Sequence, residues 1–222
     1  MKSKNIFIFD NHALIQHLMS YLRDKNTPTS EFRKLMKQIT TLMGYKVLKH
    51  LTLNPVKIKT PMKATEARRI PEKNIPFIVI ILRAGDGMRE AMLELIPTAK
   101  VGYIGLRRVE SKKIKTNRRQ KVVIEEYLNN LPSDADKREA IILDPMLASG
   151  TSASHAITLL KEVGVKKIKF MCIVSCDAGL TKVTTDHPDV KFFCAGNDKK
   201  LLPNNYISPG LGDAGDRLCG TL

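Results

Sequence analysis

Ile141-Ile142-Leu143-Asp144-Pro145-Met146-Leu147-Ala148-Ser149-Gly150-Thr151-Ser152 is the stretch that decides the fold. Its first three residues are typical of a buried strand, an acid follows at the strand's end, and small residues then open a helix. Backbone N–H groups in such a loop can point at a phosphate, and the following helix adds the positive end of its dipole. The stretch therefore predicts an anion site between a strand and a helix.

Asp144 narrows the ligand, because a carboxylate beside a phosphate site cannot serve to attract the anion. It makes sense if the ligand also carries hydroxyl groups or a metal ion. A phosphate together with sugar hydroxyls indicates a phosphorylated ribose. The alternative is a small-residue turn between strand and helix that binds nothing, as occurs in many α/β proteins.

The chain on either side alternates between strand and helix patterns. We expect strands at 77–82, 101–106, 141–143, 168–174 and 190–194, and helices at 88–95, 152–163 and 178–186. Continuous apolar runs such as 77–82 are typical of strands covered on both faces. Alternation at this spacing predicts right-handed βαβ units and an α/β fold with a parallel sheet.

The ends of the chain differ from this core, and at 222 residues we expect one domain. Residues 1–75 have helical spacing, with Thr29 or Ser30 as a cap. Residues 76–200 form the core, in which 106–128 is an antiparallel arm whose Val122–Ile124 segment pairs with 102–106. Residues 201–222 are a glycine-rich tail with neither a helical nor a strand period.

The formal net charge is +15, which suits either a nucleic-acid binder or an enzyme whose substrate carries several phosphates. Basic residues concentrate between Arg107 and Lys121, with Glu110 as the acid among them. Few aromatic residues interrupt this cluster, so stacking on bases is poorly provided for. A solvated basic hairpin is the plainer interpretation.

The four cysteines, Cys172, Cys176, Cys194 and Cys219, lack metal-type spacing, and we interpret them as buried thiols in a reducing cytoplasm. The longest apolar run is too short to cross a bilayer. The first ten residues have no cleavage-site pattern, so we expect no signal peptide.

Chemically active segments follow the predicted strands at the edge where open parallel sheets bind ligands. Arg83 directly follows a buried strand, which favours a positioned cation and a second anion site over a structural ion pair. Ala84 and Gly85 let the backbone approach a ligand. The tail 205–217 mixes Gly with Asp and Pro, unlike a disordered segment, and its backbone groups suit the edge of a flat ligand.

These segments, in this order, resemble those of the uracil phosphoribosyltransferase family. The likeness covers nearly the whole chain and includes the opening helices, with Pro-Gly-Leu-Gly-Asp-Ala-Gly-Asp at 209–216 as its specific part. It implies a type I phosphoribosyltransferase-like parallel sheet flanked by helices, with an antiparallel β-arm, an N-terminal helical region and a C-terminal hood.

The resemblance also implies a reaction, in which uracil and 5-phosphoribosyl-1-diphosphate (PRPP) give UMP and diphosphate in pyrimidine salvage. It implies Mg²⁺ bound mainly through the diphosphate, with no metal site of the protein's own. A homodimer or homotetramer, GTP as an effector and a cytoplasmic location away from membranes are further expectations. Nucleic acid is not an expected partner.

Residue roles carry over position by position. Asp144 matches the acid that holds the ribose hydroxyls, residues 148–152 match the 5-phosphate loop, and the catalytic residues are expected to be Arg83, Arg108 and Asp213. The full PRPP site is expected to comprise Arg83, Arg108, Asp144, Pro145, Met146, Leu147, Ala148, Ser149, Gly150, Thr151, Ser152 and Asp213. The uracil site is expected to comprise Ile207, Gly212, Asp213 and Ala214.

The chain departs from the family's usual pattern at Thr151, at Ser175–Gly179, at Gly196–Asp198 and in its long basic arm, and no general base is evident. These departures bear on regulation and arm behaviour more than on the reaction. Two other functions stay open at this point: a purine-type phosphoribosyltransferase, which the tail argues against, and an RNA-binding regulator on the same scaffold, which the charge favours.

Overall fold

The computed structural model describes residues 5–109 and 123–221. Its main sheet runs in the order β1-β10-β9-β7-β4-β5-β6, and the short β8 pairs with β9. All of its strand pairs are parallel except β5 with β6. The bounds are β1 Ile6–Ile8, β4 Phe77–Leu82, β5 Val101–Val109, β6 Val123–Asn130, β7 Ala140–Leu143, β8 Met146–Leu147, β9 Ile168–Cys176 and β10 Lys191–Asp198.

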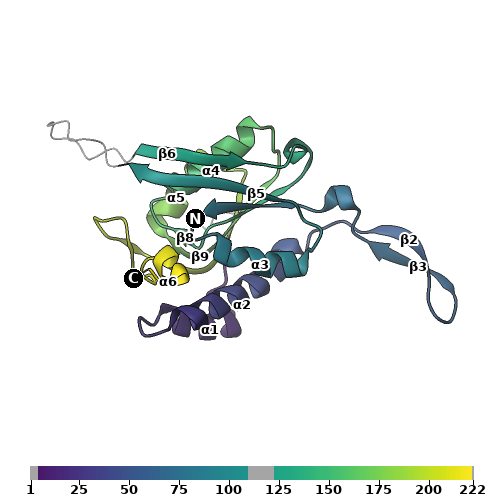
Figure 1. The fold of residues 1–222 in the computed structure, drawn as a ribbon, viewed down its shortest axis with the longest axis horizontal. Coiled ribbons are helices and arrows are strands. Elements are labelled where there is room, and N and C mark those ends of the chain that lie inside the picture. Colours follow the sequence, from purple (N-terminus) through teal and green to yellow (C-terminus); the bar gives the residue numbers. More distant parts are fainter. Residues whose placement is uncertain (1–4, 110–122, 222) are drawn as a thin grey trace.

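Helices cover both faces of this sheet (Figure 1). One apolar core joins the sheet to α1 (Ala13–Arg23), α2 (Thr29–Leu48) and α3 (Asp86–Leu95), and a second joins it to α4 (Thr151–Glu162) and α5 (Asp177–Asp186). Every residue of β9 is buried, because alternate side chains enter opposite cores. Two short 3₁₀ turns, Glu72–Asn74 and Ala135–Lys137, precede β4 and β7.

The predicted α/β architecture is confirmed, and the run 77–82 matches β4 residue for residue. The other predicted strands and helices lie within a few residues of the observed ones, since burial on both faces demands continuous apolar runs. The helix predicted to follow a Thr29 or Ser30 cap is α2, but it begins at Thr29 with Pro28 in the capping position.

The helical prediction for residues 1–75 is wrong in two places. Residues 6–8 form β1 at the edge of the main sheet, where they pair with β10. Residues 54–69 form a hairpin of β2 (Asn54–Lys59) and β3 (Ala64–Arg69) that extends away from the sheet (Figure 1). The strands in both segments are short, so the alternation of apolar and polar residues is too brief to distinguish them from the long helices nearby in the sequence.

The antiparallel arm is confirmed, but with a different register. Ile124 lies opposite Arg108, two residues beyond the predicted partner segment 102–106, and a register shift between Gly105 and Leu106 accommodates the pairing. Residues 110–122, which hold most of the basic cluster, lie outside the described residues.

Three of the predicted buried thiols, Cys172, Cys176 and Cys194, are confirmed, whereas Cys219 is exposed. Cys219 ends a short helix, and a six-residue helix on the surface buries only one side. In the part of the chain that the structure describes, no helix is long and apolar enough to cross a membrane.

The C-terminal tail is more regular than its sequence predicts. It contains β12 (Ile207–Ser208), which pairs antiparallel with β11 (Lys200–Leu201), and α6 (Ala214–Cys219). Figure 1 shows α6 between the sheet edge and the helices α1 and α2. A helix this short has almost no period of its own, so its position depends on contacts with the rest of the chain.

Arg217 supplies those contacts. Its side chain is buried, and it donates to the backbone carbonyls of Leu22, Leu211 and Asp24 at 2.6–2.8 Å. The guanidinium also lies 4.4 Å from the centroid of the Phe32 ring. Burial lowers the pKa of Arg217. Arg217 thereby supplies hydrogen-bond donors to carbonyl groups at the end of α1 and attaches the tail to that helix.

A second pair attaches the tail from the sheet side. Arg23 at the end of α1 donates to both carboxylate oxygens of Asp198 at 2.7 and 3.0 Å, and to the Gly210 carbonyl at 2.7 Å. Asp198 at the end of β10 in turn accepts from the Gly210 N–H at 2.9 Å. Bidentate geometry with a largely buried carboxylate makes this pair stronger than an exposed one.

We expect Arg217→Met to destabilise the fold by about 3 kcal/mol, because buried carbonyl groups lose their donors. For a chain of this length that loss lowers the melting temperature by roughly 6–12 °C in a calorimetric or circular-dichroism scan. The matched control is Arg33→Met, which removes a single exposed bond to the Leu218 carbonyl of the same helix. Equal melting temperatures for the two variants would contradict the anchoring role.

Candidate active site

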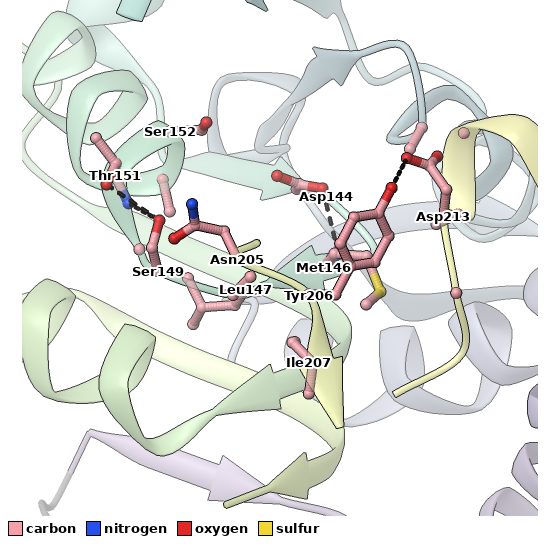
Figure 2. Close-up of a pocket in the computed structure, with 17 residues that line it drawn as sticks. Asp144, Met146, Leu147, Ser149, Thr151, Ser152, Asn205, Tyr206, Ile207 and Asp213 are labelled. Atoms are coloured by element: carbon pink, nitrogen blue, oxygen red, sulfur yellow. Dashed lines mark hydrogen bonds between the residues drawn. The ribbon is translucent and has the colours of Figure 1, made fainter. Parts of the chain in front are cut away.

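A pocket of about 330 Å³ lies beyond the carboxyl end of β7, between the loop that opens α4 and the C-terminal tail (Figure 2). Open parallel sheets bind their ligands at this edge, beyond the carboxyl ends of the strands. Its lining residues are Ala84, Asp144, Met146, Leu147, Ala148, Ser149, Gly150, Thr151, Ser152, Ala153, Asn205, Tyr206, Ile207, Gly212, Asp213, Ala214 and Gly215.

The loop before α4 forms one wall. Asp144 follows β7 directly, and its Oδ1 accepts from the Met146 N–H at 3.2 Å, which closes a tight turn. Gly150 has φ +78° in the left-handed region and precedes α4, and its residue type offers no side chain to cap that helix. The start of this 12-residue helix therefore lines the pocket without a side-chain cap from Gly150, and the Ser149 Oγ accepts from the Thr151 N–H at a long 3.5 Å.

Two glycines bring this loop against α5. A Cβ added at Gly179 would overlap the Ala148 carbonyl and lie 2.8 Å from that of Leu147, and one at Gly150 would lie 2.8 Å from the Gly179 carbonyl. Backbone therefore packs on backbone, and the position of the loop depends on α5. Gly179 belongs to the Ser175–Gly179 segment that departs from the family pattern.

Ser175 and Asn197, which also lie in the segments that differ from the family pattern, belong to a hydrogen-bonded network at the start of α5. Ser175 donates to the Asn197 Oδ1 at 2.8 Å, and the Asn197 amide donates to the Asp177 carboxylate at 2.6 Å. These contacts join the ends of β9 and β10 to the start of α5. Ser175, Asn197 and Asp177 thus form one polar network.

The C-terminal tail forms the opposite wall. Ile207, Gly212 and Ala214 line the pocket, and Gly212 has φ +80°. Asp213 caps α6 by accepting from the Asp216 N–H at 3.0 Å, and its second oxygen accepts from the Tyr206 hydroxyl at 3.3 Å (Figure 2).

Arg83 lies at the margin of the pocket. Its Nη2 is 3.3 Å from Asp216 Oδ1, and 62% of its side chain is exposed. Its neighbour Ala84 lines the pocket, whereas Gly85 does not: a Cβ there would overlap the Leu143 and Ile81 carbonyls. The strand backbone thus leaves no room for a side chain at Gly85, and its role in letting the backbone approach a ligand stays a prediction.

The structure thus brings most predicted site residues to one pocket. Arg83 and Pro145 are not among the lining residues, and of Arg108 only the backbone, in β5, is described. The predicted PRPP and uracil sets leave out five lining residues: Ala84, Ala153, Asn205, Tyr206 and Gly215. Asn205 carries a usable signal, since the Asn204-Asn205 pair is typical of a turn that needs positive φ.

Known proteins share both the sequence and this fold. The family model described as uracil phosphoribosyltransferase matches residues 9–221. The uracil phosphoribosyltransferase of Staphylococcus carnosus is 47% identical over 216 residues, which cover 97% of this chain and 98% of that protein. The Geobacillus kaustophilus enzyme of the same name matches equally, at 47% identity and the same coverage.

The chain belongs to the uracil phosphoribosyltransferase family. The enzyme accordingly transfers the 5-phosphoribosyl group from PRPP to uracil in pyrimidine salvage. This membership overturns the purine-type alternative. The predicted reaction and family are confirmed.

Solved structures agree with this conclusion. A protein from Aquifex aeolicus has a TM-score of 0.85 at 31% identity, over 96% of this chain and 97% of that one. The adenine phosphoribosyltransferase of Leishmania donovani has a TM-score of 0.56 at 15% identity, over 92% and 88% of the two chains. The latter likeness shows the type I phosphoribosyltransferase fold alone.

We expect Gly179→Ala to slow UMP formation by between about ten- and a hundredfold, because a displacement of about 1 Å in a positioning loop has effects of that size. The new Cβ overlaps the Ala148 carbonyl, so the loop must move. The rate is measured with labelled uracil at fixed PRPP. Ala178→Ser, at the exposed neighbouring position, is the control, and an unaffected rate in Gly179→Ala would contradict the packing argument.

Proposed function

We propose that the loop 148–152 binds the 5-phosphate of PRPP and that Asp144 holds the ribose hydroxyls. The observation that carries this proposal is that the start of α4, which has no side-chain cap from Gly150, and Asp144 line the same pocket. Helix N–H groups favour an anion, and a carboxylate accepts from hydroxyl groups. A phosphorylated sugar satisfies both demands at once.

Uracil occupies the tail wall in this proposal, against Ile207, Gly212, Asp213 and Ala214. Its edge presents O2, N3–H and O4, which pair with backbone donors and acceptors. Cytosine would place a lone pair at N3 where the site offers a carbonyl acceptor. That mismatch costs about 1–3 kcal/mol, enough to select the base.

Arg83 and Arg108 bind the diphosphate in this proposal. The bond between ribose C1 and the diphosphate oxygen breaks, uracil N1 bonds to C1, and the N1 proton passes to diphosphate or water. Positive charge develops on the sugar and negative charge on the leaving group, so fixed cations near the diphosphate stabilise the transition state. Asp213 lines the same pocket, where its carboxylate would stabilise the positive charge that develops on the sugar.

Mg²⁺ fits this site as a companion of the diphosphate. Among the residues that the structure describes, no group of three or more His, Cys, Asp or Glu side chains is placed to hold a metal ion. Mg²⁺ typically uses one or two carboxylates with substrate phosphates and water, and Asp144 and Asp213 line the pocket. The ion would neutralise charge on the diphosphate.

We expect Arg83→Ala to lower kcat/KM for PRPP by about a hundredfold, because the leaving anion loses a cation. Folding is little affected, since the exposed pair with Asp216 contributes little to stability. Steady-state kinetics and a thermal melt measure the two effects. Arg89→Ala on α3 removes a comparable exposed pair, with Asp86, and is the control. Wild-type turnover in Arg83→Ala would remove this residue from the site.

We further propose that the enzyme is a homo-oligomer held by the β2–β3 hairpin. Val56 pairs with Ala67 and Ile58 with Thr65, so these side chains share one face. Met62 at the tip is 91% exposed. An isolated two-stranded hairpin is marginal in water, and its largely apolar face suits burial against a second copy.

We expect Ile58→Lys to lower the mass in solution toward that of the 24.9 kDa monomer, because a charge enters the buried face. Light scattering or sedimentation measures the mass. Lys57→Gln on the opposite face leaves it unchanged. A monomeric wild-type protein, or an undiminished mass in Ile58→Lys, would contradict the proposal. The GTP effector and the cytoplasmic location stay predictions.

A further inference from the structure

Asn205 stands out within the pocket. It is the one residue other than glycine in the described chain with positive φ, at +63°. Its backbone N–H donates to the Leu202 carbonyl at 2.9 Å, which closes a turn just before Tyr206. The turn places the Asn205 side chain in the pocket lining, on the tail side.

The side-chain amide of Asn205 has no hydrogen-bond partner in the part of the chain that the structure describes. Figure 2 shows its end directed toward the wall formed by Ser149 and Thr151. Ser149 and Thr151 are themselves joined, with their hydroxyl oxygens 3.1 Å apart. The amide therefore faces the loop from across the pocket without being bound to it.

We propose that Asn205 is a substrate-binding residue whose Nδ2–H donates to the 5-phosphate from the side opposite the loop. This inference rests on the proposed role of residues 148–152. A primary amide has two donor hydrogens, and rotating it by a half-turn exchanges its nitrogen and oxygen. The phosphate is then held between the helix N–H groups on one side and an amide on the other.

A purely structural role for Asn205 makes a different prediction. Asn is among the residues that tolerate positive φ, so the turn alone accounts for its presence. Glycine adopts the same conformation with no steric penalty, and Asp has nearly the same shape as Asn. If the turn were all that matters, both replacements would leave substrate binding unchanged.

The test compares Asn205→Gly and Asn205→Asp for binding of UMP and uridine by calorimetry, and for PRPP kinetics. We expect the glycine variant to lose about tenfold in UMP affinity, as for one hydrogen bond to a charged group. The aspartate variant loses more, because a carboxylate then faces the phosphate. The KM for PRPP rises in parallel, whereas uridine binding and the melting temperature stay close to wild type.

Wild-type UMP affinity in Asn205→Gly would overturn the inference, as would equal losses for UMP and uridine. Gly179→Ala tests the loop separately. If it weakens UMP binding while Asn205→Gly does not, the loop assignment stands and the Asn205 inference fails. If UMP binding is unaffected in Gly179→Ala, the proposed phosphate position itself fails.

Discussion

The active pocket depends on the hydrogen bonds by which Arg217 attaches the C-terminal tail to the end of α1. A buried guanidinium is costly to desolvate, and three backbone carbonyls together with the Phe32 ring compensate it. The bidentate pair of Arg23 with Asp198 repeats the arrangement on the sheet side. These contacts, together with the burial of Ile207, Leu211 and Ala214 in the apolar core, hold the tail over the sheet, where it forms one wall of the pocket.

The two walls of the pocket are held in place by different means. The wall beside α4 is set by close backbone packing at Gly150 and Gly179, where no side chain fits. The wall formed by the tail is set by side-chain anchors that lie outside the pocket. Both walls bring glycines and small polar residues to the pocket, which suits a reaction that depends on positioning and electrostatics.

Elements predicted from the sequence are confirmed where burial dictates the residue pattern. The strand at 77–82 has to be apolar throughout because both of its faces are covered, and its end then places Arg83 at the ligand edge. The sequence prediction is wrong where the pattern is short, as in the hairpin at 54–69, which has only a few alternating residues. The packing of Gly85 against carbonyls of β4 and β7 has no signal in the local sequence.

The sequence by itself determined the α/β fold class, the strand, loop and helix around residues 144–152 and, through its tail motif, the family. These features are local, since each depends on residues close together in the chain. Only the tertiary structure decided that Gly179 supports that loop, that Arg217 anchors the tail and that Asn205 faces the loop across the pocket. These are contacts between segments far apart in the chain. The periodic pattern of the local sequence does not indicate which distant backbone groups a side chain will contact.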